Sequence, residues 1–164
     1  EWTGETRVLV PSPRDVPSYD HKPQMSADEV TTRFVDELER KPYAFAVVNF
    51  ANPDMVGHTG SIPATVKAVE TVDACLGKVV AAVEAKGGVS LVTADHGNAE
   101  QMLETDGTSP HTAHTTNLVP LIVTDPRVAL RDTGELSDLA PTVLDFLGFK
   151  QPLQMTQKGL TNPP

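Results

Sequence analysis

Apolar residues at helical spacing mark the first predicted element of the chain. Val30, Phe34 and Leu38 lie on one face of a helical repeat. They follow Ser26-Ala-Asp-Glu29, which has the form of a capping box, with a serine before the helix and a glutamate three residues later. This pattern predicts a helix from residue 26 or 27 to about Lys41.

Two further stretches have the same spacing and clear ends. A long one begins at Ser61, with Pro63 just inside it, and is stopped by Gly87 and Gly88. A shorter one runs from Ser137 or Asp138 to Leu147 and is stopped by Gly148. We expect helices in both, and we expect residues 151–164 to form a loop.

Short apolar runs of strand length alternate with these helices. They cover residues 43–50, 89–93 and 119–124, and a shorter one covers 7–10. Because strand, long helix and strand follow one another, we expect a right-handed βαβ unit. The fold class expected is α/β, with a mostly parallel sheet and helices on both faces, in a single domain over residues 1–164.

Composition narrows the classes of partner. The chain has 164 residues, of which 39% are hydrophobic and 21% are charged. Its net charge is −9 and its basic residues are dispersed along the sequence. This charge pattern argues against a nucleic-acid partner. The chain lacks an apolar run of the ~20 residues that span a bilayer, so we expect no membrane insertion. The single cysteine, Cys75, allows no internal disulfide and fits a reducing cytoplasm.

Histidines and aspartates gather in three short clusters. These are Asp54-Met-Val-Gly-His58, Asp95-His96-Gly-Asn-Ala, and His111-Thr-Ala-His114. The first two follow predicted strands, and the third precedes one. Since ligand sites form at the carboxyl ends of parallel strands, we expect all three clusters to meet there. Carboxylates and neutral imidazoles are ligands for divalent metals, so the clusters predict a two-metal site.

Each cluster alone has an ordinary explanation. Asp54 suits a helix cap, and the four-residue spacing to His58 would place both on one helical face. Asp95 suits a turn after a strand. In the third cluster His114 is the better ligand candidate, while His111, like Asn98, is a candidate to orient ligands by hydrogen bonds. Their joint occurrence favours the metal site.

The clusters closely resemble those of cofactor-independent (2,3-bisphosphoglycerate-independent) phosphoglycerate mutase. Other segments share the likeness in order along the chain: Pro11-Ser-Pro13, Met25-Ser-Ala-Asp-Glu-Val30 and Leu139-Ala-Pro-Thr-Val-Leu-Asp-Phe-Leu-Gly148. The resemblance implies an alkaline-phosphatase-like fold and an isomerase of glycolysis and gluconeogenesis that interconverts 3- and 2-phosphoglycerate through a phosphoserine. It also implies two Mn²⁺ ions, although the donors leave Zn²⁺ or Mg²⁺ open.

Carried over by motif, the resemblance divides the ligands between the two ions. Asp54, His58 and His114 would hold one ion, and Asp95 and His96 the other. One ion would lower the pKa of the serine nucleophile, and both would neutralise charge on the transferring phosphoryl group.

The chain matches only the C-terminal portion of that family. The nucleophilic serine, an N-terminal aspartate, the catalytic lysine and the inserted phosphotransferase domain with its arginines have no counterpart in it. We therefore expect a partial domain that contains no catalytic residue, carries five metal ligands and is inactive alone, with phosphoglycerate as a partner only of the complete enzyme.

Two rival hypotheses remain. The chain could be part of another two-metal phosphatase, phosphodiesterase or phosphomutase of the same superfamily. It could instead be a non-catalytic interaction module that kept the fold. Coding sequence upstream with an Asp-Ser nucleophile segment and an arginine-rich insert would favour the mutase.

Overall fold

The structure is a computed structural model, and it describes residues 2–161. Its elements are a 3₁₀ turn Tyr19–His21, helices α1 Ala27–Arg40, α2 Asn52–Gly57 and α3 Ile62–Ala85, strands β1 Leu91–Thr93 and β2 Leu121–Val123, a 3₁₀ turn Leu136–Asp138, and helix α4 Leu139–Leu147. The three predicted helices are confirmed, and α2 is an additional short one. Among residues 2–161, no helix combines the length and apolarity needed to cross a membrane.

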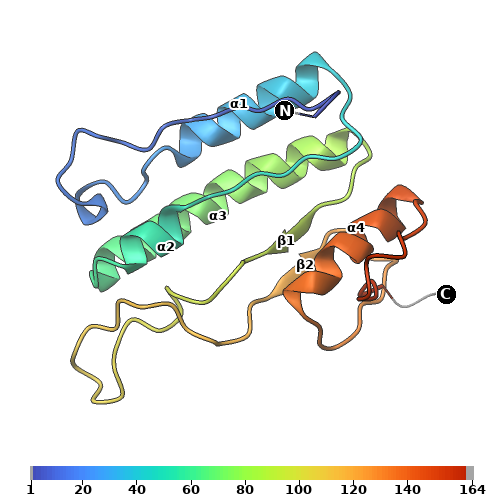
Figure 1. Ribbon diagram of the computed structural model, residues 1–164. Coiled ribbons are helices and arrows are strands. Elements are labelled where there is room, and N and C mark those ends of the chain that lie inside the picture. Colours follow the sequence, from blue (N-terminus) through green and yellow to red (C-terminus); the bar gives the residue numbers. More distant parts are fainter. Residues whose placement is uncertain (1, 162–164) are drawn as a thin grey trace.

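Helices α1 and α3 lie side by side, and α2 leads into the beginning of α3 (Figure 1). The core between them is small. Val56 of α2 is fully buried and packs against Met25, Ala64 and Ala68, with Tyr19 at the edge of the cluster. Small residues on α3 let the shorter helix approach closely. The position of α2 is therefore fixed by apolar packing on one of its faces.

The capping box predicted before α1 does not form. The Ser26 side chain makes no cap hydrogen bond, and its hydroxyl instead donates to the Pro11 carbonyl oxygen at 2.8 Å. The hydroxyl has one hydrogen to donate, and it joins the N-terminal segment to the start of α1. The helix end itself is correctly predicted, since Lys41 is the residue that leaves helical geometry.

Both ends of α3 form where the sequence predicts them. Pro63 occupies the first turn, where a missing N–H costs nothing because that donor has no intrahelical partner. At the other end Gly87 has φ +73°, a left-handed conformation that favours glycine. The helix therefore stops before the chain turns into β1.

The sheet differs from the expected one. Within residues 2–161, β1 pairs only with β2, and the pairing is antiparallel, with Val92 opposite Ile122. The expected strands 89–93 and 119–124 are thus confirmed as shorter elements, but the βαβ unit is not formed. The reason is that the strand expected before α3 has no ladder in the described part of the chain.

The strands expected at 7–10 and 43–50 are wrong for this structure. Neither segment forms a ladder, and several of their apolar side chains face solvent: Leu9 is 89% exposed, Val47 79% and Phe45 55%. A strand requires a neighbour to satisfy its N–H and C=O groups, and no described residue provides one. Apolarity alone therefore did not produce a strand.

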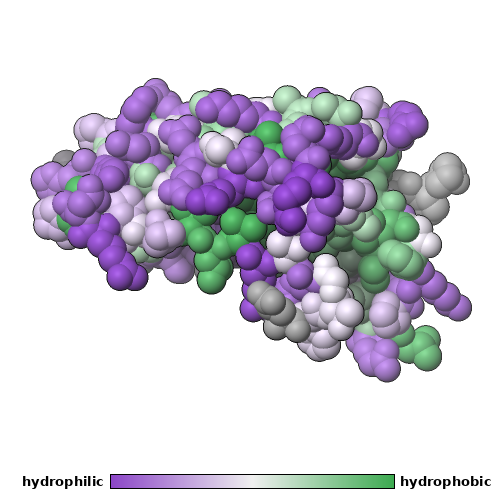
Figure 2. All heavy atoms as spheres, turned by 90° about the horizontal axis from the view of Figure 1, so that it is seen from above, coloured by the Kyte–Doolittle hydropathy of each residue, from purple (hydrophilic) through white to green (hydrophobic). Residues whose placement is uncertain are grey.

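These two segments and one face of α1 line an open groove of about 660 Å³. Its lining is mostly apolar, and Val30 and Phe34 contribute from α1. Figure 2, which views the molecule from above, shows hydrophobic atoms reaching the surface among hydrophilic ones. We call the surface formed by residues 4–10 and 43–49 with this face of α1 the apolar groove.

The tail beyond α4 is a loop, as expected, but it is anchored. Leu160 is buried, its N–H donates to the Thr142 hydroxyl at 2.8 Å, and its carbonyl accepts from the Arg131 N–H at 2.9 Å. Gly148 at the end of α4 has φ +69°, as its C-terminal position predicts.

Candidate metal centre

The antiparallel pairing of β1 and β2 brings two of the histidine clusters together. The chain leaves β1 at Thr93 and enters β2 at Leu121, and we call the part of this connection that follows β1 and the part that precedes β2 its two limbs. An isolated β-bridge between Gly97 and Thr115 joins the two limbs. Residues just after β1 therefore lie beside residues that precede β2. The clusters converge as predicted, but through an antiparallel pair rather than along the rim of a parallel sheet.

The remaining cluster, Asp54 to His58, comes from α2 and its C-terminal end, and α2 is held in place at its first residue. Asn52 is buried, and its side-chain amide donates to the carbonyl oxygens of Pro23 at 2.9 Å and Gln24 at 2.8 Å. Pro53 follows in the first turn, and Val56 faces the core. Asp54 consequently lies on the opposite side of α2, toward the bridged limbs.

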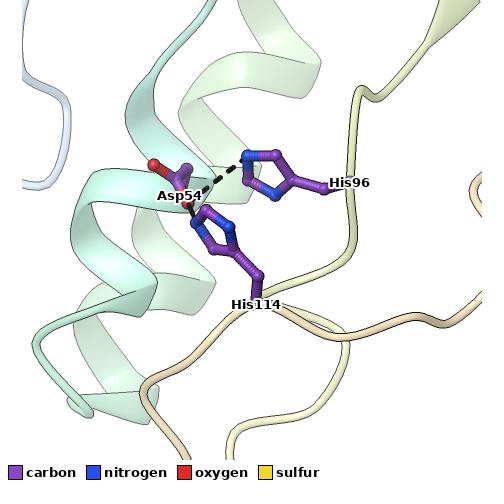
Figure 3. Close-up of side chains that lie close together, drawn as sticks. All are labelled: Asp54, His96 and His114. Carbon is purple, nitrogen blue, oxygen red and sulfur yellow. Dashed lines mark hydrogen bonds and ion pairs between the residues drawn. The ribbon is translucent and has the colours of Figure 1, made fainter.

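One oxygen of Asp54 is the centre of the site (Figure 3). Asp54 Oδ1 lies 3.0 Å from His114 Nε2, 3.1 Å from His58 Nε2 and 3.9 Å from His96 Nε2. Donor atoms of Asp54, His96 and His114 all lie within 4.8 Å of one another. Three elements distant in sequence thus present a carboxylate and imidazoles to one point.

The tautomer of His58 follows from its other ring nitrogen. His58 Nδ1 lies 2.6 Å from the Thr112 carbonyl oxygen, which can only accept, so Nδ1 carries the hydrogen. In the neutral ring Nε2 is then a bare lone pair. It faces the Asp54 carboxylate and lies 3.0 Å from His114 Nε2. Two acceptors that face each other need a cation or a proton between them, and a lone pair fixed by a backbone carbonyl is the form that binds metal.

The histidine rings form a short stack at the edge of the molecule. His96 stacks on His114 with ring centroids 3.7 Å apart, and His58 is tilted against His114 at 4.9 Å. The side chains of Asp54, His58 and His96 are 30–40% exposed. Solvent therefore reaches the donors, which gives an ion a path of entry, and the mixed oxygen and nitrogen donors fit a divalent ion such as Mn²⁺ or Zn²⁺.

Asp95 differs from the other predicted ligands. Its side chain is 85% exposed, and its contact in the described chain is with His96 Nε2 at 3.8 Å. His96, in contrast, reaches across to Asp54. The five predicted ligands are therefore arranged as four converging side chains, Asp54, His58, His96 and His114, with Asp95 at the margin.

The two residues expected to orient ligands have different surroundings. Asn98 is buried, and its amide nitrogen lies 3.1 Å from Asp54 Oδ1 and 3.4 Å from His58 Nε2. Gly57 lies against the Asn98 side chain so closely that a Cβ there would overlap it. His111 Nδ1 pairs with Glu104 at 2.9 Å, and its buried Nε2 has no hydrogen-bond partner among the described residues. His111 thus joins the two limbs near the turn between them, next to the bridge from Leu103 to Pro110.

Sequence reasoning missed Glu100, whose carboxylate joins the two limbs. It accepts hydrogen bonds from the Asn98 backbone, the Thr115 hydroxyl and the Asn117 amide. The Thr115 hydroxyl bond is the main reason that the pKa of Glu100 falls to about 2. Only the short spacing of Glu100 from His96 hinted at this, because its partners come from the other limb.

Comparison with known proteins gives a family and close relatives. The sequence model of the Metalloenzyme superfamily matches residues 1–151. The chain is 54% identical over 167 residues to a 2,3-bisphosphoglycerate-independent phosphoglycerate mutase of Herpetosiphon aurantiacus, and 56% identical over 162 residues to that of Moorella thermoacetica. Each alignment covers 97% of this chain and 31% of the relative.

A solved structure agrees with these relatives. Phosphoglycerate mutase of Leishmania mexicana, crystallised at low cobalt concentration, superposes with a TM-score of 0.88 at 34% sequence identity. The match covers 99% of this chain and 32% of that protein. The chain thus spans about a third of the length of the relatives that it matches.

Proposed function

Because the chain belongs to the Metalloenzyme superfamily, we propose that it is the metal-holding C-terminal part of a 2,3-bisphosphoglycerate-independent phosphoglycerate mutase. Residues 1–164 would form one unit of the phosphatase-like domain. The observation that carries the proposal is the convergence of His58, His114 and His96 on Asp54 Oδ1. It supports a metal-binding role for the segments that carry the family likeness.

Asp54, His58 and His114 would hold the first divalent ion, and His96, which lies between Asp54 and Asp95, would belong with Asp95 to the second. Asp54 and His58 come from one helix end, His96 follows β1, and His114 precedes β2. His58 is prepared for this role by the Thr112 carbonyl, which keeps the hydrogen on Nδ1. An ion bound there supplies Lewis-acid stabilisation of negative charge on a phosphoryl oxygen. Asn98 would hold the Asp54 carboxylate in place.

The second ion would depend on residues outside this chain. Asp95 is exposed beside His96, so it is free to turn toward an ion that other ligands share. In our proposal the rest of the enzyme supplies those ligands together with the serine nucleophile. We propose Mn²⁺ as the physiological ion. The chain alone would then bind one ion more tightly than a second and would not interconvert 3- and 2-phosphoglycerate.

The rest of the enzyme would also complete the sheet. Residues 7–10 and 43–50 have the apolar composition of buried strands but no strand neighbour among residues 2–161. With partners from the remaining two thirds of the polypeptide, they would extend a mostly parallel sheet with helices on both faces. A cytoplasmic location, as for other glycolytic enzymes, belongs to the same proposal.

A complementation assay tests the mutase proposal. The chain is assayed for conversion of 3- to 2-phosphoglycerate with Mn²⁺, alone and together with the separately produced remainder of the Herpetosiphon aurantiacus relative. We expect no turnover alone and measurable turnover in the mixture. The Asp54→Asn chain should fail to restore it, whereas Asp132→Asn, an exposed aspartate in another region, should succeed. Turnover by the chain alone near the rate of a full-length enzyme would contradict the proposal.

A further inference from the structure

The Glu100 carboxylate lies between the two limbs that carry the histidine ligands. Oε1 accepts hydrogen bonds from the Thr115 hydroxyl and, at 2.9 Å, from the Asn117 amide nitrogen. Oε2 accepts from the Asn98 backbone N–H at 2.6 Å. Both oxygens are therefore engaged, one on each limb. Asp54 also contacts both limbs, through Asn98 and His114, but it does so from α2, whereas Glu100 joins the limbs from within.

The partners of Glu100 are direct neighbours of the metal-binding side chains. Thr115 follows His114 in the sequence, and its N–H donates to the Gly97 carbonyl next to His96 at 2.9 Å. Asn98, whose backbone Glu100 holds, donates from its side chain to Asp54 at 3.1 Å. A displacement of Glu100 would therefore be transmitted to ligands on both limbs and to the ligand on α2.

The two limbs are closely packed around Glu100, in addition to being joined by hydrogen bonds. A Cβ added at Gly97 would overlap both the Thr115 hydroxyl and the Glu100 carboxylate, so the two limbs approach each other without spare room. The lowered pKa of Glu100, about 2, agrees with an ionised group that only accepts. Glu100 is not a member of the converging donor group itself. Its contacts with three donors indicate a structural link rather than a ligand.

We propose that Glu100 is a positioning residue that fixes His114 and Asn98 relative to Asp54 and thereby sets the affinity of the site for a divalent ion. This inference rests on the metal site described under the proposed function. It adds a residue that touches none of the ligand atoms. Carboxylates that orient ligands in this indirect way typically contribute 10–100-fold to metal affinity.

The test compares two carboxylates that each accept three hydrogen bonds. Asp106 accepts from the Ser109 hydroxyl and from the N–H groups of Thr108 and Ser109, and its pKa is also about 2, but all its partners lie within one turn. Glu100→Gln replaces an oxygen by an NH₂ group that must face a donor. Asp106→Asn makes the same chemical change without touching the link between the limbs.

Both variants and the wild type are titrated with Co²⁺, followed by calorimetry and by the visible absorption spectrum of the bound ion. We expect Glu100→Gln to bind ~10–100-fold more weakly with a changed spectrum, and Asp106→Asn to match the wild type in both. Because the spectrum reports the ligand arrangement, a general loss of stability would not reproduce its change. If Glu100→Gln does not fold, Asn117→Ala, which removes one hydrogen bond, should change the spectrum in the same direction.

The outcomes separate the two proposals. Wild-type affinity and spectrum in Glu100→Gln, or in Asn117→Ala where that variant is needed, overturn the positioning role and leave the metal site intact. An equal loss in Asp106→Asn also overturns it, because the effect would then belong to the loop as a whole. No Co²⁺ binding by the wild type overturns the metal site and, with it, this role.

Discussion

The candidate metal centre and the apolar groove differ in whether their segments find hydrogen-bonding partners within the described chain. At the metal centre, α2 and the two limbs between β1 and β2 interlock through Asp54, Asn98 and Glu100. In the apolar groove, residues 7–10 and 43–50 lie along α1 without strand partners, and Leu9 and Val47 are mostly exposed. Hydrogen bonds within the described chain join the segments of the first region, whereas residues 7–10 and 43–50 of the second have no strand partner there.

The difference shows what each region requires. Polar side chains can complete a site when their partners come from the same polypeptide, however distant in sequence. A strand needs a complete neighbouring strand, and that neighbour is not among residues 2–161. In our account the metal centre is therefore largely preformed in this chain, whereas the apolar groove is completed by the remainder of the enzyme.

The largest effect is expected from removing the central carboxylate. Asp54→Asn exchanges a charged acceptor for an amide at the point where three imidazoles converge. We expect Mn²⁺ affinity to fall by more than ~100-fold, beyond the loss typical of indirect contacts. Asp95→Asn should cost much less, because Asp95 is exposed at the margin. Calorimetric titration measures both, with Asp132→Asn as the control, and equal losses at Asp54 and Asp95 would contradict the arrangement.

A matched pair of valine substitutions compares the packing of the two regions. Val56 is fully buried behind the metal centre, and Val47 lines the apolar groove and is 79% exposed. Val56→Ala leaves a cavity and should lower the free energy of unfolding by about 2 kcal/mol. Val47→Ala should change it by no more than about 0.5 kcal/mol, as for a surface position. Urea unfolding measures both, and a large loss at Val47 would mean that the groove is packed in the free chain.

Acid should weaken the link between the two limbs. Glu100 has a pKa of about 2 in the fold against an ordinary 4.5, so its ionised form stabilises the fold fully above pH 4.5 and progressively less down to pH 2. The stability difference between wild type and Glu100→Gln in the metal-free chain should therefore shrink over this range. Urea unfolding at pH 6, 4 and 3 follows it. A difference that stays constant would show that ionised Glu100 does not stabilise the fold.

The smallest effect is expected when a substitution is made in the apolar groove and metal affinity is measured at the other region. Leu9→Lys places a charge on the apolar groove at a residue that is 89% exposed. Since that groove and the metal centre share no partner residue in the contacts described here, Mn²⁺ affinity should stay within about twofold. A larger change in Mn²⁺ affinity would show that the two regions are coupled in the free chain and would contradict the expectation that they are independent.

The sequence predicted the elements that depend on local signals. Spacing and end signals placed α1, α3 and α4, and Gly87 and Gly148 end their helices with positive φ as expected. The capping box failed because the Ser26 hydroxyl found a partner at Pro11, far away in sequence. Local patterns do not reveal such competition.

Pairing between distant segments was harder to predict. The apolar run 43–50 has strand composition, but a ladder depends on a neighbour that composition does not specify. The candidate metal ligands could be proposed because their residue types are chemically distinctive, and four of the five converge. Glu100 was missed because a lone glutamate is ordinary on a surface, and only the approach of Thr115 and Asn117 gives it a role.

Titration of the wild-type chain with Mn²⁺ tests the central claim most directly, namely that Asp54, His58 and His114 form a preformed site for one divalent ion, while Asp95 and His96 supply only part of a second site. We predict saturable binding with one tight equivalent, a much weaker second one, and loss of the tight equivalent in Asp54→Asn. Absence of saturable binding, or two equally tight sites unaffected by Asp54→Asn, would contradict the account.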